Sequence, residues 1–176
     1  MPTSEKSSPQ SLLGFLTASF FCAFVTAEGA FAGLTSWYLV IQRPNWAAKP
    51  AVFEPVWLIV YGLAGLGAWL AYRSEPSRRT AFIVVFCLLF ELSALWAWLF
   101  FAWHLLVGAV VVAVVLWAAL FAWAGWMFRL RATAGALTVP LVCWFCYASA
   151  LSLATYRLNP PSPAGSNAPT VIDVTQ

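Results

Sequence analysis

Charged side chains are scarce in this chain. Asp, Glu, Lys and Arg make up 9% of its 176 residues, whereas 62% are hydrophobic, and the mean hydropathy is +0.83. About a quarter of the residues in a soluble domain are charged. So few charges cannot cover a globular surface with polar groups. The composition therefore excludes a soluble globular protein and predicts a membrane protein.

Side chains that serve metal sites and catalysis are equally few. His104 is the single histidine; at its helix junction we expect a surface role, with axial ligation of a metallated tetrapyrrole as the alternative. The four cysteines fall in apolar stretches, which argues against a secreted disulfide framework. Cys143 and Cys146 match C-x-x-C, but apolar burial disfavours the reactive thiolate, so packing is the expected role. The sequence contains no metal-ligand cluster and no phosphate-binding loop, and we expect no metal site.

Long apolar runs are what the chain does contain. A membrane-spanning helix needs about 20 apolar residues, and five runs reach that length: 11–41, 53–72, 80–103, 105–128 and 132–158. Backbone groups in lipid must bond within their own segment, which favours helices. The sequence thus predicts an all-α membrane protein, a compact bundle of five transmembrane helices over residues 11–159. A polar tail at 1–10 and a disordered, Pro/Ser-rich tail at 160–176 flank the bundle.

The basic residues indicate an orientation for these helices. If the N-terminus is cytoplasmic, six Lys and Arg residues lie on the cytoplasmic side and three lie opposite. The positive-inside rule then places the N-terminus in the cytoplasm of a bacterial-type membrane. The net charge of +3 and the absence of a basic stripe argue against a nucleic-acid partner.

Some polar residues and small-residue motifs fall inside the apolar runs. Glu28 and Glu91 are costly there, and we expect them to face the bundle interior. They would be either neutral acids bonded between helices or contacts for a ligand or proton. Small residues four apart permit close helix packing, within one bundle or between two protomers. These motifs are Gly29-x-x-x-Gly33, Ala64-x-x-x-Ala68 and Ala148-x-x-x-Ser152.

Eight of the eleven tryptophans divide by their depth in the runs. Those near the ends fit the aromatic belt at the membrane surface; they are Trp37, Trp46, Trp103 and Trp126. The deeper ones are expected either to fill the bundle or to line a cavity; they are Trp96, Trp117, Trp123 and Trp144.

One stretch, "SWYLVIQRPNWAAKPAVFEPVWLIVYGLAG" at 36–65, resembles the signature of the translocator protein family, the tryptophan-rich sensory proteins (TspO) or peripheral-type benzodiazepine receptors. The resemblance continues in "LWAWLFFAWH" at 95–104 and "VPLVCWFCYASAL" at 139–151. Ser93 and Ser152 stand where the family has Asn. The residues of the first stretch that match are Trp37, Tyr38, Arg43, Pro44, Trp46, Phe53, Pro55, Val56, Trp57 and Tyr61.

The resemblance implies an aromatic pocket inside the bundle for porphyrins such as protoporphyrin IX or haem, or for sterol-like molecules, with no obligatory cofactor. Carried over by position, its lining is Tyr38, Trp57, Tyr61, Ser93, Trp96, Trp144, Ala148 and Leu151. The proline-rich loop 42–52 would be a rigid lid, with Arg43, Pro44, Trp46 and Lys49 at the entrance. An anchor at the membrane surface is the alternative role of this loop. We also expect membrane lipid and a second copy of the chain as partners.

Three functions remain open at this point. The preferred hypothesis is a tetrapyrrole-binding protein with a role in transport or in sensing oxidative or light stress. The second is an enzyme that degrades protoporphyrin in light or oxygen, with Trp57 or Trp144 as the electron donor. The third is a regulatory scaffold whose pocket is incidental. No energy-coupling element is present, so pumping is not expected.

Overall fold

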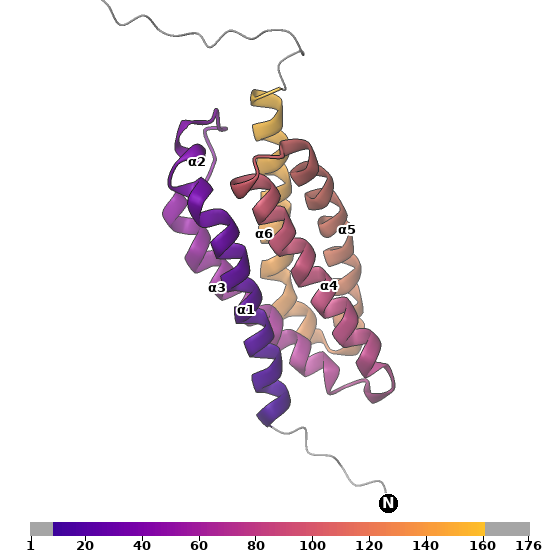
Figure 1. The fold of residues 1–176 in the computed structure, drawn as a ribbon. Coiled ribbons are helices and arrows are strands. Elements are labelled where there is room, and N and C mark those ends of the chain that lie inside the picture. Colours follow the sequence, from indigo (N-terminus) through magenta and orange to yellow (C-terminus); the bar gives the residue numbers. More distant parts are fainter. Residues whose placement is uncertain (1–8, 161–176) are drawn as a thin grey trace, which may run out of the picture.

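The computed structural model describes residues 9–160, and the parts of both predicted tails at 1–8 and 161–176 lie outside the described residues. Within residues 9–160, five apolar helices are long enough to cross a membrane, and they confirm the predicted all-α, five-helix bundle (Figure 1). The elements in chain order are α1 (Pro9–Leu34), α2 (Trp37–Val40), α3 (Pro50–Tyr72), the 3₁₀-helix η1 (Pro76–Arg78), α4 (Arg79–Ala97), the π-helix η2 (Trp98–Ala102), α5 (Leu106–Leu130) and α6 (Ala132–Leu158).

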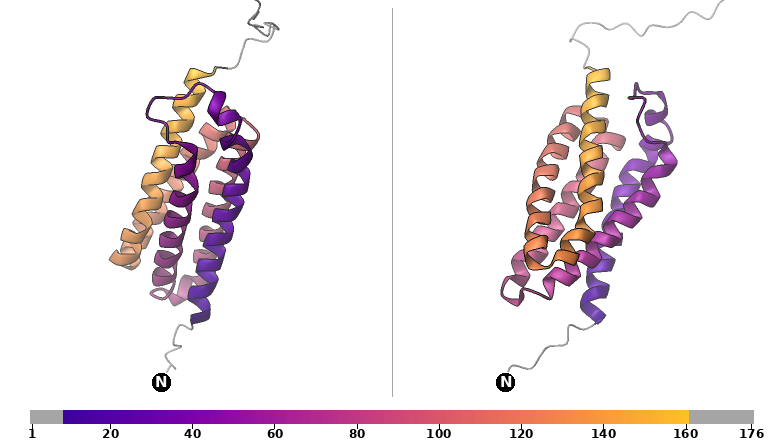
Figure 2. Two further views of the ribbon diagram at one scale, coloured as in Figure 1. Left: turned by 90° about the vertical axis from the view of Figure 1, so that its left-hand side faces the viewer. Right: turned by 180° about the vertical axis from the view of Figure 1, so that it is seen from behind.

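The long helices run side by side along one axis (Figures 1 and 2). α1 packs against α3, α4 and η2, while α6 packs against α3 and α5. Short connections such as Arg131, the one residue between α5 and α6, force neighbours to be antiparallel. α2, the loop 41–49 and the end of α6 therefore meet at one end of the bundle, opposite the start of α1 (Figure 1).

The first predicted run, 11–41, is not one helix. α1 ends at Leu34, and the four-residue α2 follows a turn at Thr35 and Ser36. The Thr35 hydroxyl donates to the Phe31 carbonyl at 3.0 Å. Such local hydroxyl bonds compete with continuation of a helix, and hydropathy alone does not register the break. The consequence is that α2 turns over the end of the bundle and buries Tyr38.

The small-residue motif of α1 acts within one protomer. A Cβ at Gly29 would lie 2.7 Å from Cγ of Trp98, and a Cβ at Gly33 would overlap the Phe101 carbonyl. The two glycines therefore let α1 approach η2 closely, with the Trp98 Nε1–H donating to the Val25 carbonyl at 3.0 Å. This settles the choice left open by the spacing for α1: its motif is used inside the bundle.

The expectation that the two acids face the interior is wrong. Glu28 and Glu91 are both exposed on the outer face of the bundle. Gly29 and Gly33 in α1 and Ser93 in α4 lie on other faces of their helices from the acids and take the inward positions, so each carboxylate points away from the core.

The deep tryptophans do not all behave alike. Trp96 and Trp123 are buried, as expected for indoles that fill the bundle. Trp117 is 41% exposed, and its Nε1–H donates to Sγ of Cys146 on the outer surface at 2.7 Å. Trp117 therefore neither fills the bundle nor lines an internal cavity.

Candidate ligand-binding site

Phe53 is the centre of an aromatic cluster under α2. Pro50 opens α3, since proline fits the first position of a helix and restricts the residue before it to extended backbone. Phe53 thus lies in the first turn and is fully buried. Its ring centroid is 5.7 Å from that of Tyr38, 5.6 Å from those of Trp57 and Trp144, and 5.3 Å from that of Phe101.

Deeper in the bundle the predicted site residues are paired by hydrogen bonds. Tyr61, one turn beyond Trp57 on the same face of α3, donates from its hydroxyl to Oγ of Ser93 at 2.7 Å. The Trp96 Nε1–H donates to Oγ of Ser152 at 2.8 Å. The two serines that replace the family's asparagines are therefore the partners of these aromatic donors.

The remaining predicted positions complete the same core. Ala148 and Leu151 of α6 are buried, and the Trp96 ring lies 5.8 Å from that of Phe101, which links the deeper pairs to the Phe53 cluster. Six of the eight predicted residues thus lie in one contiguous hydrophobic core, and Trp144 packs against it. Ser93 is buried beside them, while the role of all eight in binding stays a prediction.

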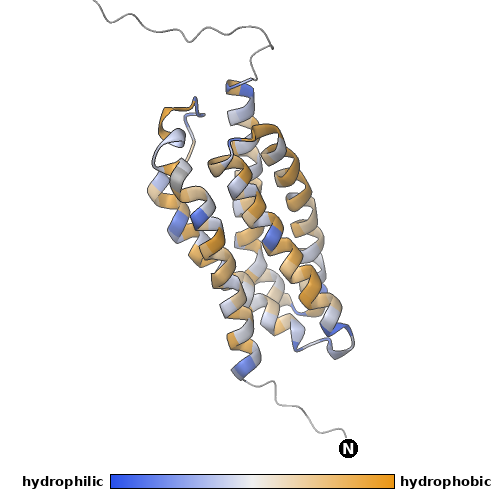
Figure 3. Cartoon of the chain, viewed as in Figure 1, coloured by the Kyte–Doolittle hydropathy of each residue, from blue (hydrophilic) through white to orange (hydrophobic). Residues whose placement is uncertain are grey.

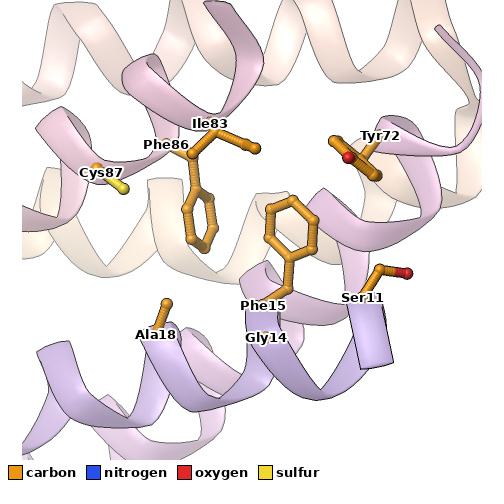
Figure 4. A pocket seen from close by; sticks show the side chains of 8 residues that line it. All are labelled: Ser11, Gly14, Phe15, Ala18, Tyr72, Ile83, Phe86 and Cys87. Carbon is orange, nitrogen blue, oxygen red and sulfur yellow. The ribbon is translucent and has the colours of Figure 1, made fainter. Parts of the chain in front are cut away.

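Aromatic side chains occupy the space between these positions. Phe53, Phe101 and Phe145 are each fully buried, so a large ligand can enter only if some of these rings move. Of the grooves on the surface of the bundle, one is remote from the predicted site residues and another touches them at the edge. One, of about 240 Å³, runs between α1 and α4 at the far end of the bundle and is lined by Phe15 and Phe86 (Figure 4). The other, between α1 and α3, includes Trp57.

Two indoles beside Phe53 have unused donors. Nε1 of Trp57 and Nε1 of Trp144 are buried, and neither finds a hydrogen-bond partner among the described residues. A buried N–H without an acceptor costs free energy, so both atoms favour a molecule that brings an acceptor. No group of three His, Cys, Asp or Glu side chains within the described part of the chain could hold a metal ion.

Hydrogen bonds from two helices hold the loop 41–49 closed over the cluster. The Tyr38 hydroxyl donates to the Ala48 carbonyl at 3.1 Å, and the Ala48 N–H donates to the Tyr147 hydroxyl at 2.7 Å. Asn159 Nδ2 donates to the Gln42 carbonyl at 2.9 Å. Burial raises the pKa of Tyr38 to about 12, so its hydroxyl remains a donor at neutral pH. This loop is shorter than the predicted lid, since residues 50–52 belong to α3.

The predicted entrance residues lie on this loop. Arg43, Pro44 and Lys49 line one open hollow, and the Arg43 guanidinium carbon lies 4.7 Å from the Tyr38 ring centroid. Trp46 does not line the hollow; its ring packs 5.8 Å from that of Tyr147. Tyr147 is the residue that sequence reasoning missed, and its only signal was a polar tip in an apolar helix.

Removal of the Tyr147 hydroxyl is expected to loosen the loop. In Tyr147→Phe the Ala48 N–H loses its acceptor, and one hydrogen bond is worth about 1 kcal/mol net. Amide hydrogen exchange in residues 41–49 should therefore become about fivefold faster. Tyr156→Phe is the matched control on the same helix, because its hydroxyl bonds none of the described residues. Equal exchange rates in both variants would contradict the role of Tyr147.

Comparison with known proteins identifies the family that has this architecture. The model of the TspO/MBR family matches residues 13–157. The chain is 29% identical over 141 residues to Protein CrtK of Rhodobacter capsulatus, covering 79% of this chain and 88% of the relative. It is 26% identical over 149 residues to the tryptophan-rich protein TspO of Archaeoglobus fulgidus, covering 85% of this chain and 94% of the relative. The protein is thus a multi-pass membrane protein, and the chain belongs to the TspO/MBR family.

Proposed function

We propose that the protein binds a flat tetrapyrrole, protoporphyrin IX or haem, in the aromatic cluster under the loop 41–49. The observation that carries the proposal is the contact of Phe53 with the rings of both Trp57 and Trp144, with the Trp144 Nε1–H buried and without a partner among residues 9–160. A macrocycle in place of Phe53 would stack on both indoles and could accept the free hydrogen bond.

Entry of the ligand follows from the chain order. Phe53 comes three residues after Pro50, where the loop ends, so opening of the loop would draw its ring out of the cluster. Among the described residues, the hydrogen bonds from Tyr38, Tyr147 and Asn159 would have to break, together with the ring contact of Trp46 with Tyr147. Arg43, beside the Tyr38 ring, would pair with a propionate of the ligand.

The loop can close the site, and the sequence shows no energy-coupling element. Such a site is suited to binding a ligand and releasing it reversibly. We therefore place the protein's role in transport along a gradient or in sensing oxidative or light stress. The lid would set the rates of binding and release.

Quenching of tryptophan fluorescence by protoporphyrin IX, titrated in the dark in detergent, tests the proposal. We expect saturable quenching at low-micromolar concentration or below. Trp144→Phe removes the free donor and should weaken binding about tenfold. Trp57→Phe keeps a smaller ring face and should weaken it about threefold. Trp117→Phe is the control, because Trp117 lies on the outer surface.

Two results would overturn the proposal. Linear quenching without saturation, equal in all four proteins, means that the porphyrin only partitions into the micelle. Saturable binding that weakens as much in Trp117→Phe as in Trp144→Phe places the site outside the aromatic cluster.

A further inference from the structure

The groove between α1 and α3 lies on the outer face of the bundle, at the end that carries α2 and the loop. It measures about 440 Å³, and Phe24, Phe31 and Leu34 of α1 supply apolar walls. Phe24 and Phe31 are exposed to the surroundings of the bundle. Within a membrane such a surface contacts lipid chains.

Two carboxylates share this groove. Glu28 of α1 and Glu54 of α3 both line it, and hydrophilic segments interrupt the apolar surface of α1 and α3 in this half of the bundle (Figure 3). Neither carboxylate forms an ion pair with any of the residues 9–160. A carboxylate on a lipid-facing surface is costly, so two of them on adjacent helices favour a cationic partner.

A second, independent observation lies at the same place. Trp57 lines the groove and is 1% exposed, and its Nε1–H has no partner among the described residues. The groove therefore brings two carboxylate acceptors and an indole with an unused donor together beside apolar walls. A ligand that matches it has an ammonium group, a carbonyl or ester acceptor and a hydrocarbon chain.

A cation on the other side of Pro50 extends the match. Pro50 lines both this groove and the hollow of the loop, where Lys49 is found. The two carboxylates of the groove and Lys49 of the hollow thus line neighbouring depressions that share Pro50. The pairing complements a zwitterionic headgroup, with its ammonium on the carboxylates and its phosphate next to Lys49.

We propose that the α1–α3 groove binds a phospholipid with a primary ammonium headgroup, of the phosphatidylethanolamine type. The ammonium N–H groups donate to Glu28 and Glu54, and the Trp57 Nε1–H donates to an ester carbonyl. A choline headgroup carries no N–H and makes no charge-assisted hydrogen bonds, so the site discriminates between the two. This site opens on the outer face of the bundle and shares Trp57 with the proposed tetrapyrrole site.

Native mass spectrometry of the detergent-solubilised protein with equal amounts of phosphatidylethanolamine and phosphatidylcholine tests the site. We expect about tenfold more bound ethanolamine lipid in the wild type. The ratio should fall to about one in the Glu28→Gln/Glu54→Gln double variant and decrease partly in each single variant. Glu91→Gln, the same change in a second groove between α1 and α4, should keep the wild-type ratio.

Several outcomes would overturn this inference. A ratio near one in the wild type, a ratio preserved in the double variant, or stronger retention of phosphatidylglycerol would each do so. If dodecylamine displaced the bound phosphatidylethanolamine as well as a phospholipid does, the groove would recognise an amine and not a lipid headgroup. Protoporphyrin titration of the double variant is expected to match the wild type, because neither carboxylate belongs to the aromatic cluster.

Discussion

Gly33→Ala is expected to destabilise the folded protein severely. The Cβ of the alanine would overlap the carbonyl oxygen of Phe101 and lie 2.6 Å from its carbonyl carbon and 2.9 Å from its Cα. These are backbone atoms, so no rotamer change relieves the overlap, and α1 must move away from η2. Overpacking against a rigid backbone costs about 3 kcal/mol or more. We expect a large loss of monodisperse protein after solubilisation.

Gly125→Ala is the matched control for this prediction. A Cβ at Gly125 meets no heavy atom within 4 Å, and alanine is a better helix former than glycine by about 1 kcal/mol. Thermal unfolding followed by circular dichroism in one detergent should show a lower midpoint for Gly33→Ala and an equal or higher midpoint for Gly125→Ala. Similar midpoints in the two variants would disprove the close approach of α1 to η2.

The approach of α1 to η2 also shapes the aromatic cluster. η2 is a π-turn, in which the Trp103 N–H donates to the Trp98 carbonyl at 2.8 Å. A π-turn inserts a residue into the helical register, and here the consecutive Phe100 and Phe101 are both fully buried. Gly33 therefore supports the position of Phe101, one of the rings around Phe53.

The sequence was sufficient to predict the five spans, because the number and length of apolar runs decide them. It did not predict the break after Leu34, the π-turn at Trp98–Ala102 or the outward orientation of Glu28. Each of these depends on which neighbour a helix face meets, and hydropathy carries no such information. The sequence did not predict the conformation of His104 either. This residue has a positive φ of 57°, and its ring stacks on that of Trp37 with the centroids 4.4 Å apart.

The candidate site divides in the same way. The positions of Tyr38, Trp57 and Trp144 followed from the family resemblance, and the fold brings them around one ring. That Phe53 fills the space between them is a property of tertiary packing. Residue spacing cannot distinguish an open pocket from one closed by a side chain of its own.

Phe53→Ala is expected to lower stability and to strengthen tetrapyrrole binding at the same time. Loss of a fully buried phenyl ring costs about 3–5 kcal/mol, since Phe53 contacts Tyr38, Trp57, Phe101 and Trp144. In the wild type a ligand must first displace this ring, and binding is weakened by the fraction of molecules in which it is displaced. The alanine variant removes that cost, so its Kd for protoporphyrin IX should fall about tenfold or more.

Phe82→Ala separates the effect on the site from the effect on the fold. Phe82 is equally buried but packs with Phe15, Tyr72, Trp123 and Trp126, far from the loop. Both variants should melt earlier than the wild type. Saturating protoporphyrin IX should raise the melting midpoint most in Phe53→Ala, because ligand stabilisation grows with the ratio of ligand concentration to Kd. Equal shifts in the two variants would mean that Phe53 does not occupy the ligand's place, whereas a shift confined to Phe53→Ala is the result expected if its ring is what the ligand replaces.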